Sequence, residues 1–277
     1  MAYLSRMKPH LRLLFFLLLF SVHSVAQEPL RLLSWNIQDF GRTKDSSEIR
    51  AIAQVVADYD VVAIQEVVAG YGGAQAVARL ADQLNRLGER WDYRVSDPTD
   101  SPKYKTERYA FLWKTGRVQL RGRPWLAGSL PEAVFREPYL ARFRFGEHGL
   151  LIANYHARRH DEAPEEEIAL LAELPALYPG DCFLLAGDFN RSEEHPVFDA
   201  LERQGYRPAI LGQPTTLKHY CDDRSNYLNH AIDNVYLPGG CLPSTRAGVL
   251  DLVEDCTRLE EVRRWSDHLP VWVEIAW

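Results

Sequence analysis

The sequence has few cysteines and no arrangement of them that suits zinc. No two are at Cys-X-X-Cys spacing, and no cluster of histidines accompanies them. In an exported chain an even number fits two disulfide bonds, for which four cysteines allow three pairings. The cysteines are Cys182, Cys221, Cys241 and Cys256. We favour the pair Cys241–Cys256 because these two are the closest in sequence, while the other pairings remain open.

Internal repeats, low-complexity runs and linkers rich in serine and glycine are also absent. We therefore interpret residues 27–277 as one domain, which is long enough to bury a sizeable core. A glycine-rich stretch begins at Gly70, but it lacks the Gly-Lys-Ser/Thr ending of a P-loop. That stretch is therefore predicted to be a loop that leads into a helix.

An excess of positive charge is absent as well. The first 26 residues hold three of the 32 lysines and arginines and none of the 38 acidic residues, which leaves residues 27–277 at a net charge of −9. Such a chain is not expected to capture nucleic acid by bulk electrostatics. This argues against a DNA-binding module. It does not exclude an enzyme whose carboxylates hold metal ions and whose few arginines contact phosphates.

A marked apolar run lies near the start of the chain, from Leu13 to Val22. Basic residues precede it, and Ser24-Val25-Ala26 places small residues where a signal peptidase cleaves. Residues 1–26 are therefore predicted to be a signal peptide, which implies a secreted or periplasmic protein. The alternative is an uncleaved anchor, although the run is short for a membrane span. No second run of spanning length follows, so we expect no membrane span after cleavage.

Strand and helix signals alternate at first, and strands dominate the middle of the chain. This mixture predicts an α/β sandwich and not a purely parallel sheet. A capping box at Asp45–Glu48 marks the start of a helix through about Val56. The other expected helices are 70–87, 164–177 and 196–204. The expected strands are 30–35, 60–67, 108–114, 117–122, 139–145, 150–156, 182–186, 230–238 and 269–277.

The stretch CFLLAGDFNRSEEHP, residues 182–196, begins as a buried strand and then turns abruptly polar. In an extended chain Asp188 and Asn190 share one face and Phe189 takes the other. Two oxygen-bearing side chains on one face suit a hard cation or a phosphate. The alternative is that Gly-Asp-Phe-Asn is simply a turn.

The same feature recurs along the chain, because other apolar strands also end at, or are interrupted by, polar residues. Six such strands in one domain would gather their polar residues at one end of a sheet, where open α/β folds bind ligands. Most of these residues carry oxygen, which suits Mg²⁺, Mn²⁺ or Ca²⁺ and not a soft metal. They are Asn36, Glu66, His156, Asp188, Asn190, Asp233, Asp267 and His268.

As an ordered set, these motifs resemble the endonuclease/exonuclease/phosphatase superfamily. The motifs are SWNIQDFG, DVVAIQEV, LLIANYH, LLAGDFN, AIDNVYL and SDHLPVWVEI, and they span nearly the whole of residues 27–277. The resemblance implies a four-layer α/β sandwich of two packed mixed β-sheets flanked by helices. YKTERYAFLWK and VFREPYLARF are similar to the deoxyribonuclease I branch.

The resemblance also implies roles for individual residues. Glu107 would orient His156, and Asp233 would orient His268, as two carboxylate–imidazole pairs. By the same family pattern, a divalent ion would be held by Asn36, Glu66 and Asp267. The attacking water and the phosphate would be positioned by Asp188 and Asn190. DNA phosphates would be contacted by Tyr104 and Arg136.

The chain departs from that branch at two places. Val67 and Val68 follow Glu66 where a basic residue is usual, and Asn234 follows Asp233 where an arginine is common. Other basic residues lie beside the site motifs and can either grip phosphates or form a solvated cluster. These are Arg158, Arg159, His160 and Arg191.

Three functions fit this sequence to different degrees. The first is a secreted endonuclease that uses Mg²⁺ or Mn²⁺, with Ca²⁺ as a further candidate, and cleaves DNA with little sequence specificity to leave 5′-phosphate ends. The second is a metal-dependent phosphoesterase acting on a phospholipid or a sugar phosphate. The third, a catalytically dead binding module, predicts the loss of a metal or histidine position, and none is lost.

Overall fold

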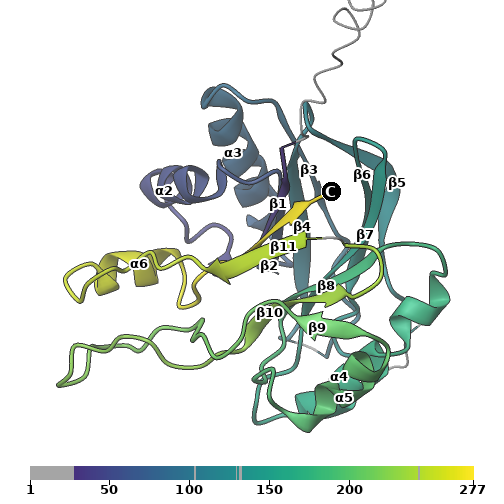
Figure 1. Ribbon diagram of the computed structural model, residues 1–277. Helices are drawn as coiled ribbons and strands as arrows, with labels where there is room; N and C mark the ends of the chain where they lie inside the picture. Colours follow the sequence, from purple (N-terminus) through teal and green to yellow (C-terminus); the bar gives the residue numbers. More distant parts are fainter. Residues whose placement is uncertain (1–27, 103, 129, 131–132, 243) are drawn as a thin grey trace, which may run out of the picture.

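Two six-stranded β-sheets pack face to face, with helices on both outer faces (Figure 1). The computed structural model describes residues 28–277 except 103, 129, 131–132 and 243. The first sheet has the order β11-β12-β1-β2-β4-β3, and the second has the order β5-β6-β7-β8-β10-β9. The predicted signal peptide lies outside the described residues, and its cleavage and the domain boundary stay predictions.

The strands and helices have the following bounds. The first sheet holds β1 (Leu30–Phe40), β2 (Val61–Val68), β3 (Trp91–Val95), β4 (Glu107–Lys114), β11 (Ser244–Val249) and β12 (Val271–Ala276). The second holds β5 (Val118–Leu126), β6 (Tyr139–Phe145), β7 (His148–His156), β8 (Phe183–Asp188), β9 (Tyr206–Pro208) and β10 (Asp233–Pro238). The helices are α2 (Ser46–Val56), α3 (Gly73–Arg86), α4 (Pro164–Leu171), α5 (Asp199–Arg203) and α6 (Leu259–Trp265), with 3₁₀ turns at Leu174–Leu177 and Pro196–Phe198.

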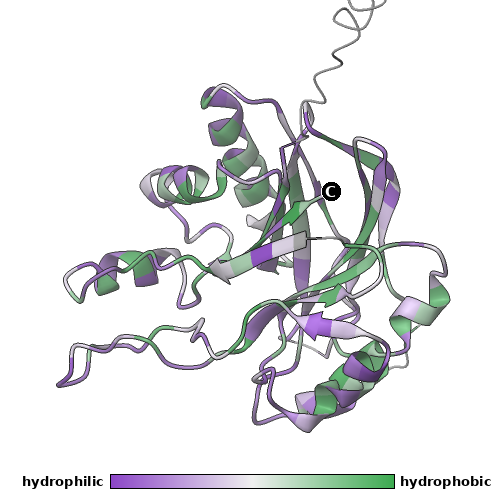
Figure 2. Ribbon diagram, in the orientation of Figure 1, coloured by the Kyte–Doolittle hydropathy of each residue, from purple (hydrophilic) through white to green (hydrophobic). Residues whose placement is uncertain are grey.

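Three apolar clusters divide the molecule into four layers. One lies between the sheets and includes Phe111 and Phe143. A second joins the first sheet to α2, α3 and α6, and a third joins the second sheet to α4 and α5. Figure 2 shows apolar residues on both the strands and the helices, where they alternate with hydrophilic ones. The predicted four-layer α/β sandwich is confirmed.

The strand directions explain why polar residues gather at one end. β1 is parallel to β2, and β7 is parallel to β8, so the carboxyl ends of each pair lie together. β4 and β10 run antiparallel to β2 and β8, so both begin where those strands end. One end of the sandwich therefore collects the last residues of four strands and the first residues of two others.

Most predicted elements are present, and one predicted helix is broken. The capping box of α2 forms as expected, with Asp45 accepting from the backbone and Glu48 accepting from the Asp45 N–H. The helix expected over 164–177 ends at Leu171, and a 3₁₀ turn follows. Pro175 lacks a backbone N–H, and its ring would clash with the carbonyl of Leu171 in a continuous helix. The strands β3, β9 and β11 and the helix α6 were not among the predicted elements.

The disulfide pairing differs from the expected one. Cys182 bonds Cys241, and Cys221 bonds Cys256, so the expected Cys241–Cys256 pair is wrong. β10 pairs antiparallel with β8, which brings the residues after β10 back to the residue before β8. Sheet topology therefore decides this bridge, and proximity in sequence does not. Among the described residues, no helix is both long and apolar enough to cross a membrane.

Peptide mapping of the oxidised protein should recover the Cys182–Cys241 and Cys221–Cys256 cross-links. Replacing Cys182 and Cys241 together with alanine should lower the free energy of unfolding by about 2 to 5 kcal/mol, because the bridge restricts the unfolded chain. Urea unfolding measures the loss. A Cys241–Cys256 peptide in the native protein would contradict the structure.

Candidate active site

The polar strand ends surround a cavity of about 620 Å³. Nine of the predicted site residues line it: Glu66, Tyr104, Glu107, Arg136, His156, Asp188, Asn190, Asp267 and His268. Asn36 and Asp233 lie against this lining and bond to Asp188 and His268. A larger hollow of about 720 Å³ lies beside β3 and β5. Its charged lining residues are only Arg94, Asp97 and Arg123, so the chemistry and not the volume identifies the site.

A glycine allows β8 to place its last residue against β7. Gly187 has a φ of +150°, and a Cβ there would lie 1.8 Å from the Tyr155 carbonyl oxygen. Only a residue without a side chain permits this approach, which sets Asp188 opposite His156 in the parallel register. The packing of β8 against β7 therefore requires the glycine of the Gly-Asp-Phe-Asn motif.

The strand then ends in a turn that keeps its polar residues at the cavity. Asp188 Oδ1 accepts from the Asn190 backbone N–H at 2.8 Å, and Asn190 is in the left-handed region with a φ of 51°. Phe189 is fully buried away from the cavity. The extended geometry expected for Asp188–Asn190 is therefore wrong, because the strand ends at Asp188 and Asn190 lies in a turn. The turn nevertheless places both polar residues in the lining of one cavity.

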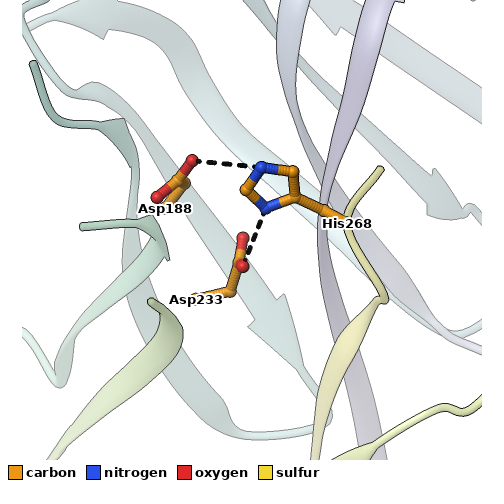
Figure 3. Close-up of side chains that lie close together, drawn as sticks. All are labelled: Asp188, Asp233 and His268. Atoms are coloured by element: carbon orange, nitrogen blue, oxygen red, sulfur yellow. Dashed lines mark hydrogen bonds and ion pairs between the residues drawn. The ribbon is translucent and has the colours of Figure 1, made fainter. Parts of the chain in front are cut away.

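Each histidine is held at Nδ1 by a buried carboxylate. His156 Nδ1 lies 2.9 and 3.0 Å from the two oxygens of Glu107. His268 Nδ1 lies 2.9 Å from Asp233 Oδ2, as Figure 3 shows. Asp233 Oδ2 also accepts from the Thr215 hydroxyl at 2.6 Å, which fixes the carboxylate itself. Both rings therefore present Nε2 to the cavity.

Both Nε2 atoms face Asp188. Asp188 Oδ2 lies 3.5 Å from His156 Nε2 and 3.8 Å from His268 Nε2. The same oxygen accepts from Asn36 Nδ2 at 3.1 Å. Figure 3 shows Asp188 and Asp233 on opposite edges of the His268 ring. One carboxylate thus connects both histidines and the asparagine of β1.

The electrostatic environment favours the charged form of each ring. Burial lowers the pKa of His156, but the neighbouring Glu107 outweighs it and the net pKa is raised. Burial also lowers the pKa of His268, but Asp233 and Asp188 together raise it to about 10. In both histidines the carboxylate at Nδ1 is therefore the main cause that raises the pKa.

The residues predicted to hold a metal ion fit a hard cation. Glu66 Oε1 accepts from Asn36 Nδ2 at 3.0 Å, and Glu66 Oε2 accepts from the Asp39 backbone N–H at 3.2 Å. Asn36 Oδ1 is buried and has no hydrogen-bond partner among the described residues. Since an unpaired buried oxygen is costly, this oxygen remains available to a cation. Asp267 lines the same cavity and carries further oxygen donors.

A second group of possible ligand atoms lies within 4.8 Å of one another, on Asp188, Asp233 and His268. Within this group Asp233 Oδ2 already bonds His268 Nδ1, so an ion held by that nitrogen would have to break the carboxylate–imidazole pair. Asn36 has a buried oxygen without a partner among the described residues, so Asn36 and Glu66 offer a cation site that needs no such change.

The two residues expected to contact phosphates lie in different environments. Tyr104 is 92% exposed at the cavity rim, with a φ of 70°. Arg136 is buried, donates to the carbonyls of His156 and Ala157, and pairs with Glu107 at 3.5 Å. That placement makes Arg136 a support for the His156 segment as well as a cationic part of the cavity wall.

Several supporting residues were missed from the sequence. Ser266 donates to the Asn36 carbonyl at 2.6 Å and accepts from the His268 N–H at 3.0 Å. Trp35 Nε1 donates to the His268 carbonyl at 2.8 Å. In the sequence, the sign that could have indicated these roles is that Trp35 precedes Asn36 and Ser266 precedes Asp267. Asn234, the departure noted above, bonds the backbone of Ile210 and so has a structural role.

Comparisons with known proteins identify the family of the chain and support its fold. Residues 33–268 match the Endonuclease/Exonuclease/phosphatase family, and the chain belongs to that family. It is 32% identical over 278 residues to a deoxyribonuclease of Thioalkalivibrio sp. (strain K90mix), which covers 93% of this chain and 74% of that protein. It is 30% identical over 266 residues to deoxyribonuclease-1 of Bos taurus, and this match covers 89% of this chain and 92% of that protein. A family protein from Bacteroides thetaiotaomicron has a TM-score of 0.64 at 19% identity over 90% of this chain and 98% of that one, which shows the shared fold.

Replacing Asn36 or Glu66 with alanine should weaken Mn²⁺ binding by more than about 10-fold, because each removes an oxygen donor. Calorimetric titration of residues 27–277 measures this without any turnover. Glu147→Ala serves as a matched control, since that carboxylate is exposed in the β6–β7 turn. Equal affinity in the Asn36 and control variants would exclude the proposed ligand.

Stability in EDTA should fall as the pH rises from 7 towards 10. The pKa of His268 is raised to about 10, above its usual value near 6.5. Its contribution is therefore fully present below about 6.5 and is lost as the pH rises through about 10. Asp233→Asn should be less stable than the wild type at pH 7, and this difference should shrink by pH 10. Urea unfolding at each pH tests this, and a constant difference would refute it.

Proposed function

We propose that this protein is a secreted, divalent-metal-dependent endonuclease that hydrolyses DNA phosphodiester bonds with little sequence specificity and leaves 5′-phosphate ends. The observation that carries the proposal is the convergence of the Glu107–His156 and Asp233–His268 pairs on Asp188. Two imidazoles facing one point can serve an in-line displacement, in which one proton leaves the nucleophile and another reaches the departing alkoxide.

Each residue group has a part in this reaction. Glu107 and Asp233 fix the ring orientation and stabilise the imidazolium, so proton transfer takes place at Nε2. Asp188 and Asn190 position the attacking water and the phosphate between the rings. Mg²⁺ or Mn²⁺ at Asn36, Glu66 and Asp267, with Ca²⁺ as a further candidate, would neutralise charge on the phosphate oxygens.

The substrate class and the location rest on separate support. Relatives that cover most of the chain are named deoxyribonucleases. The cavity presents charged and hydrogen-bonding groups suited to phosphates, which carry no sequence information. Two disulfide bonds and the predicted signal peptide support secretion or a periplasmic location.

Purified residues 27–277 should nick supercoiled plasmid in Mg²⁺, and EDTA should stop the reaction. His156→Ala should reduce the rate by at least about 100-fold, because a positioned acid–base group contributes that much. His148→Ala is the matched control, since His148 starts the same strand at its other end.

Intact plasmid under every metal condition, with a folded sample, would contradict the nuclease proposal. The same protein would then be tested on sugar phosphates and phospholipids. Nicking that survives His156→Ala would instead contradict the assignment of the site.

A further inference from the structure

Apart from its two histidines, the cavity lining holds more acidic side chains than basic ones. Its acidic lining residues are Asp39, Glu66, Glu107, Asp188 and Asp267, and its basic ones are Lys105, Arg136 and Arg159. The basic residues lie before β4, before β6 and after β7, on the side of the cavity that holds His156. These basic residues can attract a polyanion to that side, where Glu107 is already paired with His156 and Arg136.

Arg136 is largely committed to protein partners. Its guanidinium donates to the carbonyls of Lys105, His156 and Ala157 and pairs with Glu107. Only 9% of its side chain is exposed. It can add charge to the cavity wall, but most of its donors support the backbone.

Two other arginines noted in the sequence are also committed, because they brace the turn after β7. Arg158 bonds the fully buried Glu167 through both its backbone N–H and its Nε, at 2.8 and 2.9 Å. Arg191 pairs with Glu165 and donates to the His160 carbonyl. Their partners hold the segment 158–160 in place.

Arg159, between these braces, is the residue that points outward. It lines the cavity, and its side chain is 68% exposed. It forms an ion pair with Asp161 at 3.6 Å, whose side chain is itself 58% exposed, and such surface pairs are weak. Lys105 lies at the same rim, where its ion pair with Glu162 links the loop before β4 to this turn. A phosphate can displace Asp161 far more readily than it could displace Glu167 from Arg158.

We propose that Arg159, with Lys105 beside it, forms a phosphate-binding site for a substrate phosphate next to the one that is cleaved. This rests on the proposed nuclease function and deepens it. The contacts of Arg158 and Arg191 hold the backbone of Arg159 in place, so little of the chain has to become ordered when a phosphate binds. The acidic chain makes such a local contact more important, since the molecule as a whole repels DNA.

The test compares Arg159→Ala with Arg246→Ala on plasmid and on a small phosphodiester that carries a single phosphate. Arg246 is a matched control: its side chain is 76% exposed, it has a similarly weak pair at 3.5 Å with Glu274, and it lies on β11 outside the cavity lining. Arg159→Ala should raise KM for DNA by about 5- to 10-fold with kcat nearly unchanged, and reduce the salt dependence of binding by about one unit of slope. Arg159→Lys should restore most of the affinity, and the small substrate should be unaffected.

Anisotropy of a labelled DNA duplex, with His156→Ala added to each variant to prevent cleavage, gives a readout that does not need turnover. Weaker binding by the Arg159→Ala form than by the Arg246→Ala form supports the site even if plasmid nicking fails. Equal KM and equal binding in the two variants would overturn the inference while leaving a nicking wild type as a nuclease. An equal loss of kcat on both substrates would also overturn it, because Arg159 would then act at the reacting phosphate. Absence of duplex binding by every form would overturn it as well.

Discussion

The carboxylate of Asp188 connects side chains from the two sheets of the sandwich. One oxygen accepts from Asn36 of the first sheet and faces His156 of the second sheet and His268 from the segment before β12. Hydrogen-bond donors and two imidazole rings surround this buried carboxylate, which offsets the cost of burying it. The site therefore exists only when both sheets are packed in one particular register, and stability and chemistry depend on the same contact.

A buried polar bridge beneath the cavity fixes that register. Gln65 donates to Ser34 within the first sheet and to Asn154 across the sandwich, at 3.1 and 2.6 Å. Asn154 in turn donates to the carbonyls of Ile64 and Ala110. An apolar layer tolerates sliding and repacking, whereas paired amides have one good arrangement. Gln65 precedes Glu66 and Asn154 lies two residues before His156, so the bridge lies next to two of the residues that line the cavity.

Local patterns in the sequence predicted the features that depend on neighbouring residues. The buried strands, the capping box at Asp45 and the polar strand ends follow from periodicity and residue type, and the family resemblance supplied the four-layer arrangement. Features set by contacts between distant segments were not predictable in this way. The Cys182–Cys241 bridge depends on how β10 returns beside β8, and Thr215 gave no sign that it bonds Asp233. The break at Pro175 could have been predicted from its ring alone.

The basic residues near the site show why residue type alone does not assign a role. Arg158 and Arg159 are adjacent and identical in type, yet one side chain is 9% exposed and the other 68%. The difference comes from Glu167, a fully buried carboxylate that needs a cation and takes Arg158. Once that demand is met, the turn has a fixed conformation and Arg159 extends into solvent at the cavity. The buried Glu167 on α4 thus determines which of the two neighbouring arginines can contact a ligand. The position of an exposed charge therefore depends on a buried side chain that needs an ion-pair partner.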